Sequence, residues 1–296
     1  MKIGLIGLGI MGRPMAKNLV KAGQEVMVAD LNKEAVADVV AAGAKEATYA
    51  EIGKECGTII TMVPNGAIVQ SILFGEDGVC SAIQPGTVVC DMSSVTPTES
   101  QFCYDRLKEM GCEFLDAPVS GGEIGAINGT LAIMCGGDQE TFDKMVPYFE
   151  ILGSSWLLIG PSGSGSTAKL ANQMIVNNTI AIVGEAFTFA TKAGADPEKV
   201  YQAIRGGLAG SVVLDQKVPL MIARNFKPGG PIRINHKDIK NCVNAAHSID
   251  CPIPYTAQLF EIMQWMKVHG HMNDDHGGLV QYFEALADCE VKKPEA

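Results

Sequence analysis

The sequence has no excess of positive charge and no long apolar run free of charged residues. Its 296 residues carry a formal net charge of −10 and a pI near 5.0, which argue against a surface that binds nucleic acid. No stretch reaches the roughly 20 apolar, uncharged residues of a membrane span, so we expect no membrane partner. The amino-terminal segment also lacks the layout of a signal peptide, because glycines and an acid interrupt it.

Cysteine pairs with the spacing of metal or redox sites are missing too. The nine cysteines, an odd number, are scattered without a C-x-x-C pair, which argues against a disulfide framework and against zinc knuckles. We therefore expect reduced core thiols and a cytoplasmic location. Histidine is absent before His236, so no histidine from the amino-terminal half can act as a proton donor.

The first 30 residues contain the parts of a dinucleotide site in the right order. An apolar run leads into a glycine-rich turn and a helical pattern, and a second apolar run ends on an acid. Gly7 allows the tight turn, Gly9 lets the backbone approach the pyrophosphate, and Gly12 lets the helix pack closely on the strand. The helix N-terminus then offers N–H groups and a positive dipole end to the phosphates.

The acid at the end of the second run, Asp30, indicates which cofactor binds. Its carboxylate can accept hydrogen bonds from a ribose diol and would repel a 2′-phosphate, so we expect NAD(H) to be preferred over NADP(H). Lys33 lies nearby and weakens this preference without reversing it.

Alternating apolar runs and helical patterns continue to about residue 160. This alternation predicts an α/β Rossmann-type doubly wound sheet. A turn-rich stretch at 160–166 ends it, and one long helix is predicted from Thr167 to about Ala193. Helix-like segments then run to the end. We expect two domains: a dinucleotide-binding sheet domain at 1–162, and a smaller all-α domain at 163–296 that begins with the long interdomain helix.

A nicotinamide enzyme needs a proton donor beside the reacting carbon, and Lys169 is one candidate. It begins the long helix, where two domains should form a cleft, and partial desolvation there would lower its pKa. Asn172 shares its helix face. The spacing also fits an ordinary solvated lysine at a helix start. Tyr104 and Lys108 have the spacing of short-chain dehydrogenases, but the glycine spacing differs and Tyr104 lies on a helical pattern that should cover the sheet.

Two further segments could contribute to such a cleft. The stretch 116–122 follows a predicted strand, and successive N–H groups at Ser120, Gly121 and Gly122 could hold a carboxylate, although an ordinary loop fits too. Lys237 and Asp238 could add a cation and an acid, or could be surface helix residues.

The polar segment 269–276 contains three histidines and two aspartates, but their spacing matches no common metal site. We interpret it as a turn and expect no metal.

Together these motifs resemble the β-hydroxyacid dehydrogenase family. The resemblance rests on GLGIMGRPMAKNL at the start, DAPVSGG at 116–122, GSGSTAKLANQ at 163–173 and HKD at 236–238, and it covers essentially the whole chain. It implies hydride transfer between a nicotinamide cofactor and a small carboxylate-bearing aldehyde or hydroxy acid. It also implies a homodimer or homotetramer associated through the helical domain.

The resemblance further implies roles for individual residues. Lys169 would be the general acid and base, Asn172 would orient the substrate, and the three residues 120–122 would bind its carboxylate. The residues expected at the cofactor are Gly7, Leu8, Gly9, Ile10, Met11, Gly12, Asp30, Met62, Val63, Pro64, Asn65, Thr96 and Lys237.

Overall fold

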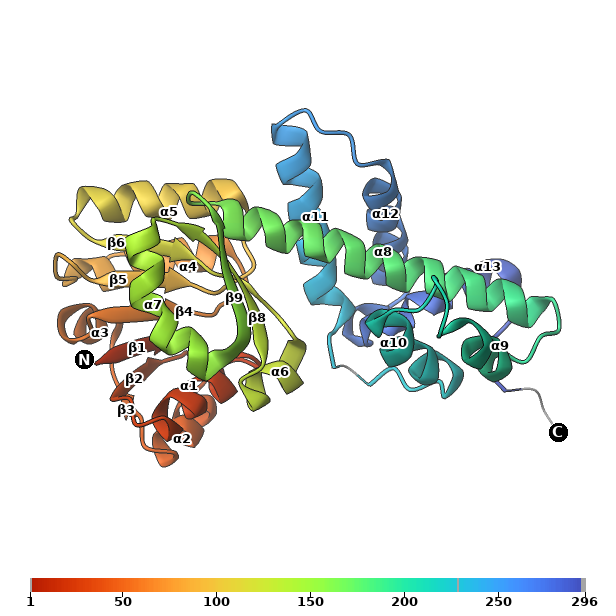
Figure 1. The fold of residues 1–296 in the computed structure, drawn as a ribbon, viewed down its shortest axis with the longest axis horizontal. Helices are drawn as coiled ribbons and strands as arrows, with labels where there is room; N and C mark the ends of the chain where they lie inside the picture. Colours follow the sequence, from red (N-terminus) through yellow and green to blue (C-terminus); the bar gives the residue numbers. More distant parts are fainter. Residues whose placement is uncertain (1, 228, 294–296) are drawn as a thin grey trace. The chain divides into compact units, whose positions relative to one another are not determined.

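The computed structural model describes residues 2–227 and 229–293 (Figure 1). By internal contacts the chain divides between Lys169 and Leu170 into two compact units. The sequence placed the boundary at residue 162, seven residues earlier. The division falls within one continuous helix, α8 (Ser164–Lys192), so α8 belongs to both units.

The first unit is built on a nine-stranded sheet with the order β3-β2-β1-β4-β5-β6-β8-β7, in which β9 also pairs with β8. The first six strands run parallel in the order 3-2-1-4-5-6, the arrangement of dinucleotide-binding folds. The predicted doubly wound sheet is therefore confirmed. The strands are β1 (Ile3–Ile6), β2 (Val26–Ala29), β3 (Lys45–Glu46), β4 (Thr58–Thr61), β5 (Val88–Asp91), β6 (Glu113–Asp116), β7 (Val119–Ser120), β8 (Leu131–Gly137) and β9 (Gly153–Gly160).

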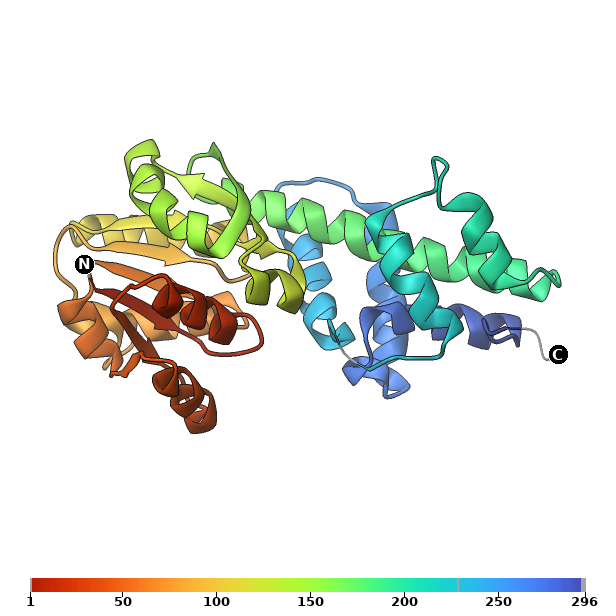
Figure 2. The same ribbon diagram turned by 60° about the horizontal axis from the view of Figure 1, so that its bottom comes forward.

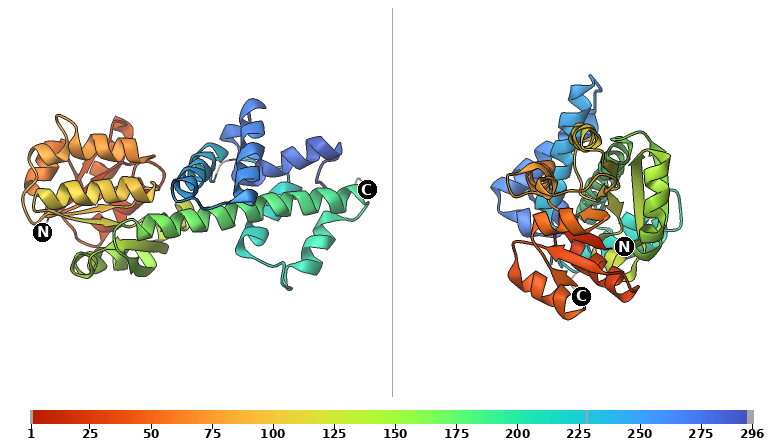
Figure 3. Two further views of the ribbon diagram at one scale, coloured as in Figure 1. Left: turned by 90° about the horizontal axis from the view of Figure 1, so that it is seen from above. Right: turned by 90° about the vertical axis from the view of Figure 1, so that its left-hand side faces the viewer.

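Helices cover both faces of this sheet, as the end-on view in Figure 3 shows. One face packs on α1 (Gly12–Lys21), α2 (Lys33–Ala41) and α7 (Gln139–Leu152). The other packs on α3 (Tyr49–Glu55), α4 (Gly66–Phe74) and α5 (Pro97–Glu109). The central strands are buried on both sides, which explains why they appear in the sequence as continuous apolar runs. A short helix, α6 (Gly122–Asn128), and a 3-10 turn (Val79–Ser81) complete the unit.

Two short strands have no counterpart among the predicted runs. β3 has only two residues, both exposed and charged, so it lacks an apolar signal. β7 pairs antiparallel with β8, which itself pairs antiparallel with β6. These antiparallel pairings depend on contacts between segments distant in sequence, which the apolar pattern does not report.

The second unit is all-helical, as expected, and its helices gather around the carboxyl-terminal part of α8 (Figure 2). Its core joins Ile180 and Phe187 of α8 to apolar side chains from each of the following α-helices. Asp196 caps the helix that begins at Pro197 by accepting the N–H groups of Glu198 and Lys199. These helices are α9 (Pro197–Ile204), α10 (Val212–Ile222), α11 (Ile232–Ser248), α12 (Pro254–Val268) and α13 (Val280–Ala287), with 3-10 turns at His271–Asn273 and His276–Leu279.

By length and composition alone, α8 is apolar enough to cross a bilayer, with a mean hydropathy of 1.2 in its most apolar window. In the structure 39% of that window is buried. Several of its polar side chains bond inside the unit: Asn178 donates to Thr256 and Gln173 donates to Asp238. These contacts tie α8 into the helical unit.

Candidate functional site

The glycine loop lies where the strand order of the sheet reverses, between β1 and β4. Gly7 has a φ of +98°, and a Cβ there would lie 2.3 Å from Met62 O. A Cβ on Gly12 would lie 1.9 Å from Gly7 O, whereas nothing lies within 4 Å of one on Gly9. The first and third glycines are therefore required by packing, and the second leaves the backbone open to a ligand.

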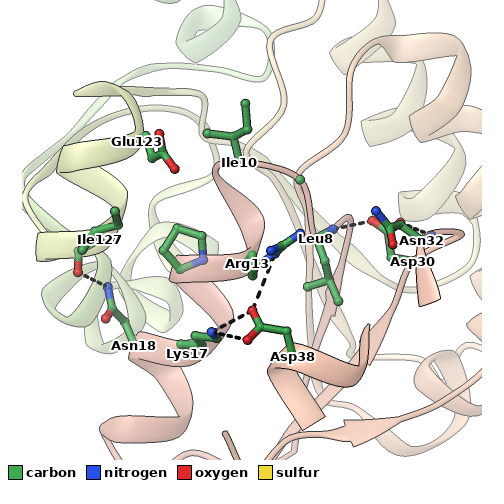
Figure 4. A pocket seen from close by; sticks show the side chains of 12 residues that line it. Leu8, Ile10, Arg13, Lys17, Asn18, Asp30, Asn32, Asp38, Glu123 and Ile127 are labelled. Atoms are coloured by element: carbon green, nitrogen blue, oxygen red, sulfur yellow. Dashed lines mark hydrogen bonds and ion pairs between the residues drawn. The ribbon is translucent and has the colours of Figure 1, made fainter. Parts of the chain in front are cut away.

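A pocket of about 670 Å³ opens beside this loop (Figure 4). Asp30, at the end of β2, stands in its wall. The N–H of Leu8 donates to Asp30 Oδ2, and the N–H of Asn32 donates to Asp30 Oδ1 at 2.7 Å. The lining residues are Leu8, Gly9, Ile10, Arg13, Pro14, Lys17, Asn18, Asp30, Asn32, Asp38, Glu123 and Ile127.

These residues fit a dinucleotide. No side chain caps the amino-terminal end of α1, although the N–H of Arg13 already donates to Gly9 O at 3.1 Å and Pro14 has no N–H. The positive end of the helix dipole is therefore the main attraction that this helix start offers to phosphates. Gly9 leaves room for phosphate oxygens, and Asp30 is tied to the loop through Leu8. A ribose diol bound at Asp30 and a pyrophosphate at the loop would be neighbours, as the dinucleotide fold requires.

The segment Met62–Asn65 follows β4 at the same sheet edge. The N–H of Val63 donates to Ser93 Oγ at 2.9 Å, which fixes the chain just beyond the strand. Asn65 caps α4 by accepting the N–H of Ile68. The structure therefore gives Asn65 a helix-capping role, and the expected cofactor role of the segment stays a prediction.

Thr96 likewise caps a helix. It forms a reciprocal capping box with Glu99 at the start of α5. Glu99 also packs against Gly66 of α4, where a Cβ would lie 2.2 Å from its carboxyl carbon. This contact brings the amino-terminal ends of α4 and α5 together at the carboxyl edge of the sheet.

The carboxylate of Asp116, the last residue of β6, holds the start of α8. Oδ1 accepts the N–H of Gly163 at 2.7 Å and Oδ2 accepts that of Ser166 at 2.8 Å. Ser166 Oγ lies 2.9 Å from Ser100 Oγ of α5. Burial raises the pKa of Asp116 to about 6, although the two N–H bonds oppose the shift. A carboxylate at a helix N-terminus satisfies donors that would otherwise lack partners.

Two glycines make this approach possible. A Cβ on Gly136 would lie 2.6 Å from Gly165 N, and one on Gly165 would lie 2.4 Å from Met134 O and 2.9 Å from Asp116 Oδ2. The first turn of α8 therefore packs directly on the backbone of β8 and on Asp116. The exit of α8 from the sheet is fixed by backbone contacts within the first unit.

Lys169 lies on this anchored part of α8, one turn after Gly165, and is half-buried. Ser120 ends β7, opposite Ala132 of β8. Gly121 and Gly122 are exposed, with φ values of 139° and 62° that favour glycine. The first unit thus holds the expected carboxylate loop and the expected general acid, and their roles stay predictions.

A buried chain of polar contacts in the second unit links Asn172 to Lys237. Asn172 Nδ2 donates to Gln173 Oε1 at 3.1 Å, and Gln173 Nε2 donates to Asp238 Oδ2 at 2.6 Å. Asp238 Oδ1 lies 2.8 Å from Lys237 Nζ. Gln173 is 8% exposed and Asp238 is 2% exposed. Two residues expected at the site are therefore bridged by a pair that the sequence did not single out together.

The alternative pair of Tyr104 and Lys108 lies on the surface of α5. Lys108 Nζ donates to Tyr104 OH at 3.0 Å, and Tyr104 OH donates to Asp138 Oδ2 at 2.8 Å. The tyrosine proton is thus directed at a surface carboxylate.

The segment 269–276 forms turns whose side chains bond within the helical unit. His271 Nδ1 lies 2.9 Å from Asp274 Oδ2, and Asp275 forms a buried ion pair with Lys217 at 2.8 Å. Burial lowers the pKa of His276 to about 4, so its ring is neutral at pH 7. Across the described residues, no group of three potential ligands is placed to hold a metal ion.

Sequence reasoning missed several residues that the fold brings to these places. Arg13, Lys17 and Asp38 line the pocket, Asp116 anchors α8, and Gln173 bridges to Asp238. Spacing along α1 could have indicated that Arg13 and Lys17 share a face. Their pairing with α2 is a tertiary contact that no local pattern reports.

Comparisons with known proteins agree with this architecture. A family model for the NAD binding domain of 6-phosphogluconate dehydrogenase matches residues 2–160, and a model for the NAD-binding domain of NADP-dependent 3-hydroxyisobutyrate dehydrogenase matches residues 163–283. The chain is 41% identical to 2-hydroxy-3-oxopropionate reductase of Escherichia coli, covering 98% of this chain and 100% of that protein.

Two more relatives show the same full-length similarity. The chain is 34% identical to 2-(hydroxymethyl)glutarate dehydrogenase of Eubacterium barkeri, over 98% of this chain and 97% of that protein. It superposes on 3-hydroxyisobutyrate dehydrogenase of Mycobacterium tuberculosis with a TM-score of 0.88 at 28% identity, over 95% of this chain and 98% of that chain.

Exchanging two glycines of the loop should separate packing from cofactor binding. Gly12→Ala should destabilise the fold by about 1–3 kcal/mol, because its Cβ overlaps Gly7 O. Gly9→Ala meets no protein atom and should keep the melting temperature, but it should weaken NADH binding about tenfold by crowding the pyrophosphate. Thermal unfolding and NADH fluorescence titration measure the two effects. Unchanged NADH affinity in Gly9→Ala would contradict the assignment.

Asp116→Asn should change how stability depends on pH. The folded-state pKa of Asp116, about 6, exceeds its ordinary value of 3.8, so this group stabilises the folded state at low pH and loses that contribution as pH rises through 6. Relative to Asp116→Asn, the wild type should gain about 2 kcal/mol in unfolding free energy between pH 7.5 and 4.5. Urea unfolding at both pH values tests this, with the exposed Asp105→Asn as control. A difference independent of pH would refute it.

Proposed function

Because this chain belongs to the β-hydroxyacid dehydrogenase family and is an NAD(P)-dependent oxidoreductase, we propose that it reduces tartronate semialdehyde (2-hydroxy-3-oxopropionate) to D-glycerate with NADH. The observation that carries the substrate assignment is the 41% identity to the Escherichia coli reductase over nearly the whole length of both chains. The segments 201–219 and 224–229 also resemble that enzyme.

The residues described above would divide the chemistry among themselves. The bound nicotinamide supplies the hydride in reduction and accepts it in oxidation. The Lys169 ammonium would protonate the developing alkoxide oxygen, and its neutral amine would accept the proton in reverse. Ser120, Gly121 and Gly122 would bind the substrate carboxylate, and Asn172 would orient the substrate. Positioning of this kind can account for several kcal/mol of a barrier.

The buried link from Asn172 to Lys237 supports these roles. It connects α8, which carries Lys169, to α11 through Gln173 and Asp238. If the side chains of Asn172 and Lys237 are ordered before the substrate binds, less conformational entropy is lost on binding.

For the cofactor we propose a preference for NADH, since Asp30 stands in the pocket wall at the end of β2. Lys33, the nearby cation that could oppose this preference, lies 2.7 Å from Glu46 of β3. This partner directs the lysine ammonium toward the sheet edge strand.

A second candidate is 3-hydroxyisobutyrate dehydrogenase or another short-chain semialdehyde reductase. It is favoured by the structural similarity to the Mycobacterium tuberculosis dehydrogenase and by the family model for the second unit. Both candidates use the same scaffold. Their substrates differ at the carbon that carries the carboxylate, which bears a hydroxyl group in tartronate semialdehyde and a methyl group in methylmalonate semialdehyde.

Turnover by a Lys169→Ala variant tests the chemistry. We expect kcat to fall by about 10²- to 10⁴-fold, because general acid catalysis is lost, while NADH affinity stays within about twofold. Lys192→Ala, at the other end of the same helix, is the matched control. Steady-state assays with tartronate, methylmalonate and succinic semialdehydes identify the substrate, and the highest kcat/KM should belong to tartronate semialdehyde. Near-normal turnover in Lys169→Ala would remove the lysine from the mechanism.

We also propose that the chain forms a homo-oligomer through α8. Ile175, Ile182 and Phe189 recur every seven residues, which places them on one helix face, and they are 69%, 58% and 74% exposed. Large apolar side chains aligned on an exposed face are typical of protein–protein interfaces. A second copy would cover them.

Substitution within this stripe should change the assembly state. Light scattering on the wild type should give a dimer or tetramer, and Ile182→Lys should shift it toward monomer because a charge would be buried at the interface. Ile249→Lys, at an equally exposed apolar position outside α8, should leave the mass unchanged. A monomeric wild type would contradict the proposal.

A further inference from the structure

The pocket beside Asp30 contains charged side chains for which the proposed chemistry has no use. Arg13 and Lys17 project from α1 and Asp38 from α2, and all three line the pocket (Figure 4). Glu123 of α6 adds a third carboxylate. The lining therefore carries two cations against three carboxylates.

Asp38 engages both cations. Its Oδ1 and Oδ2 lie 2.8 and 2.7 Å from Lys17 Nζ, and Oδ2 lies 3.8 Å from Arg13 Nε. The hydrogen bond from Lys17 holds the pKa of Asp38 below its usual value, so the carboxylate is ionised at pH 7. The three side chains are 39–42% exposed, so these pairs add little stability. What they set is the local charge of the pocket wall.

This charge matters for one chemical difference between cofactors. NADP(H) carries a 2′-phosphate where NAD(H) has a ribose hydroxyl, and dinucleotide folds accommodate that phosphate with a nearby arginine. Arg13 and Lys17 are cations in the same pocket as the ribose-binding acid Asp30. Both already share the carboxylate of Asp38.

We propose that Asp38 is a second determinant of cofactor specificity in this protein. By pairing with Arg13 and Lys17, it keeps both cations from receiving a 2′-phosphate and adds its own repulsion to that of Asp30. Discrimination against NADP(H) is thus divided between the end of β2 and the middle of α2. The inference rests on the proposed preference for NADH.

The experiment compares cofactor affinities of the wild type and Asp38→Asn. Asparagine keeps the size of the side chain and removes its charge. Dissociation constants for NADPH and NADH come from fluorescence titration of the whole protein without aldehyde. We expect NADPH to bind about fivefold more tightly in the variant and NADH to change less than about twofold, because only NADPH carries the extra charge. High salt should reduce this gain in NADPH affinity, since the side chains of Arg13, Lys17 and Asp38 are partly exposed and salt screens their charges.

Two further variants make the result specific. Glu123→Gln removes a carboxylate from the same pocket without breaking the Asp38 pairs, and it should leave the ratio of NADPH to NADH affinity unchanged. Adding Arg13→Gln to Asp38→Asn should abolish most of the gain. An unchanged ratio in Asp38→Asn, or an equal gain in Glu123→Gln, would overturn the inference. If the wild type itself binds NADPH more tightly, the proposed preference fails, while the change of ratio in Asp38→Asn still decides the role of Asp38.

Discussion

The anchoring of the first turn of α8 on the sheet is the constraint on which the proposed chemistry depends. One buried carboxylate, Asp116, accepts hydrogen bonds from the N–H groups of Gly163 and Ser166. It therefore supplies the acceptors that the first N–H groups of a helix otherwise lack. Lys169 follows within one turn of Ser166. Because proton transfer requires closely held groups, the proposed role of Lys169 depends on this buried anchor holding the first turn of α8 in place.

Much of the fold could be predicted from local patterns. The parallel strands are apolar on both faces and appear as short apolar runs, and the long helix predicted from Thr167 to about Ala193 matches α8 closely. The three glycines predicted the turn between β1 and α1, where packing excludes a Cβ at Gly7 and Gly12, while a Cβ on Gly9 would meet no atom within 4 Å. The all-helical second unit followed from the loss of strand patterns after residue 160.

The remaining features depend on contacts between distant segments. Asp116 and Gly163 are 47 residues apart in sequence, and Gln173 and Asp238 are 65 apart. Helical periodicity places each side chain on a face but does not identify its partner. The ion pairs of Asp38 with α1 are another such case. The helix caps Asn65 and Thr96 are different, because their partners Ile68 and Glu99 lie only three residues away, and the family resemblance did not indicate this local role.

The paired glycines at the root of α8 limit how the protein can be re-engineered. Gly136 and Gly165 face each other across a gap that admits no methyl group, so neither position tolerates diversification. Libraries aimed at new aldehydes should therefore keep these two codons constant. Randomisation is better spent on side chains farther along the helix and on α11, where packing is by side chains and can adjust.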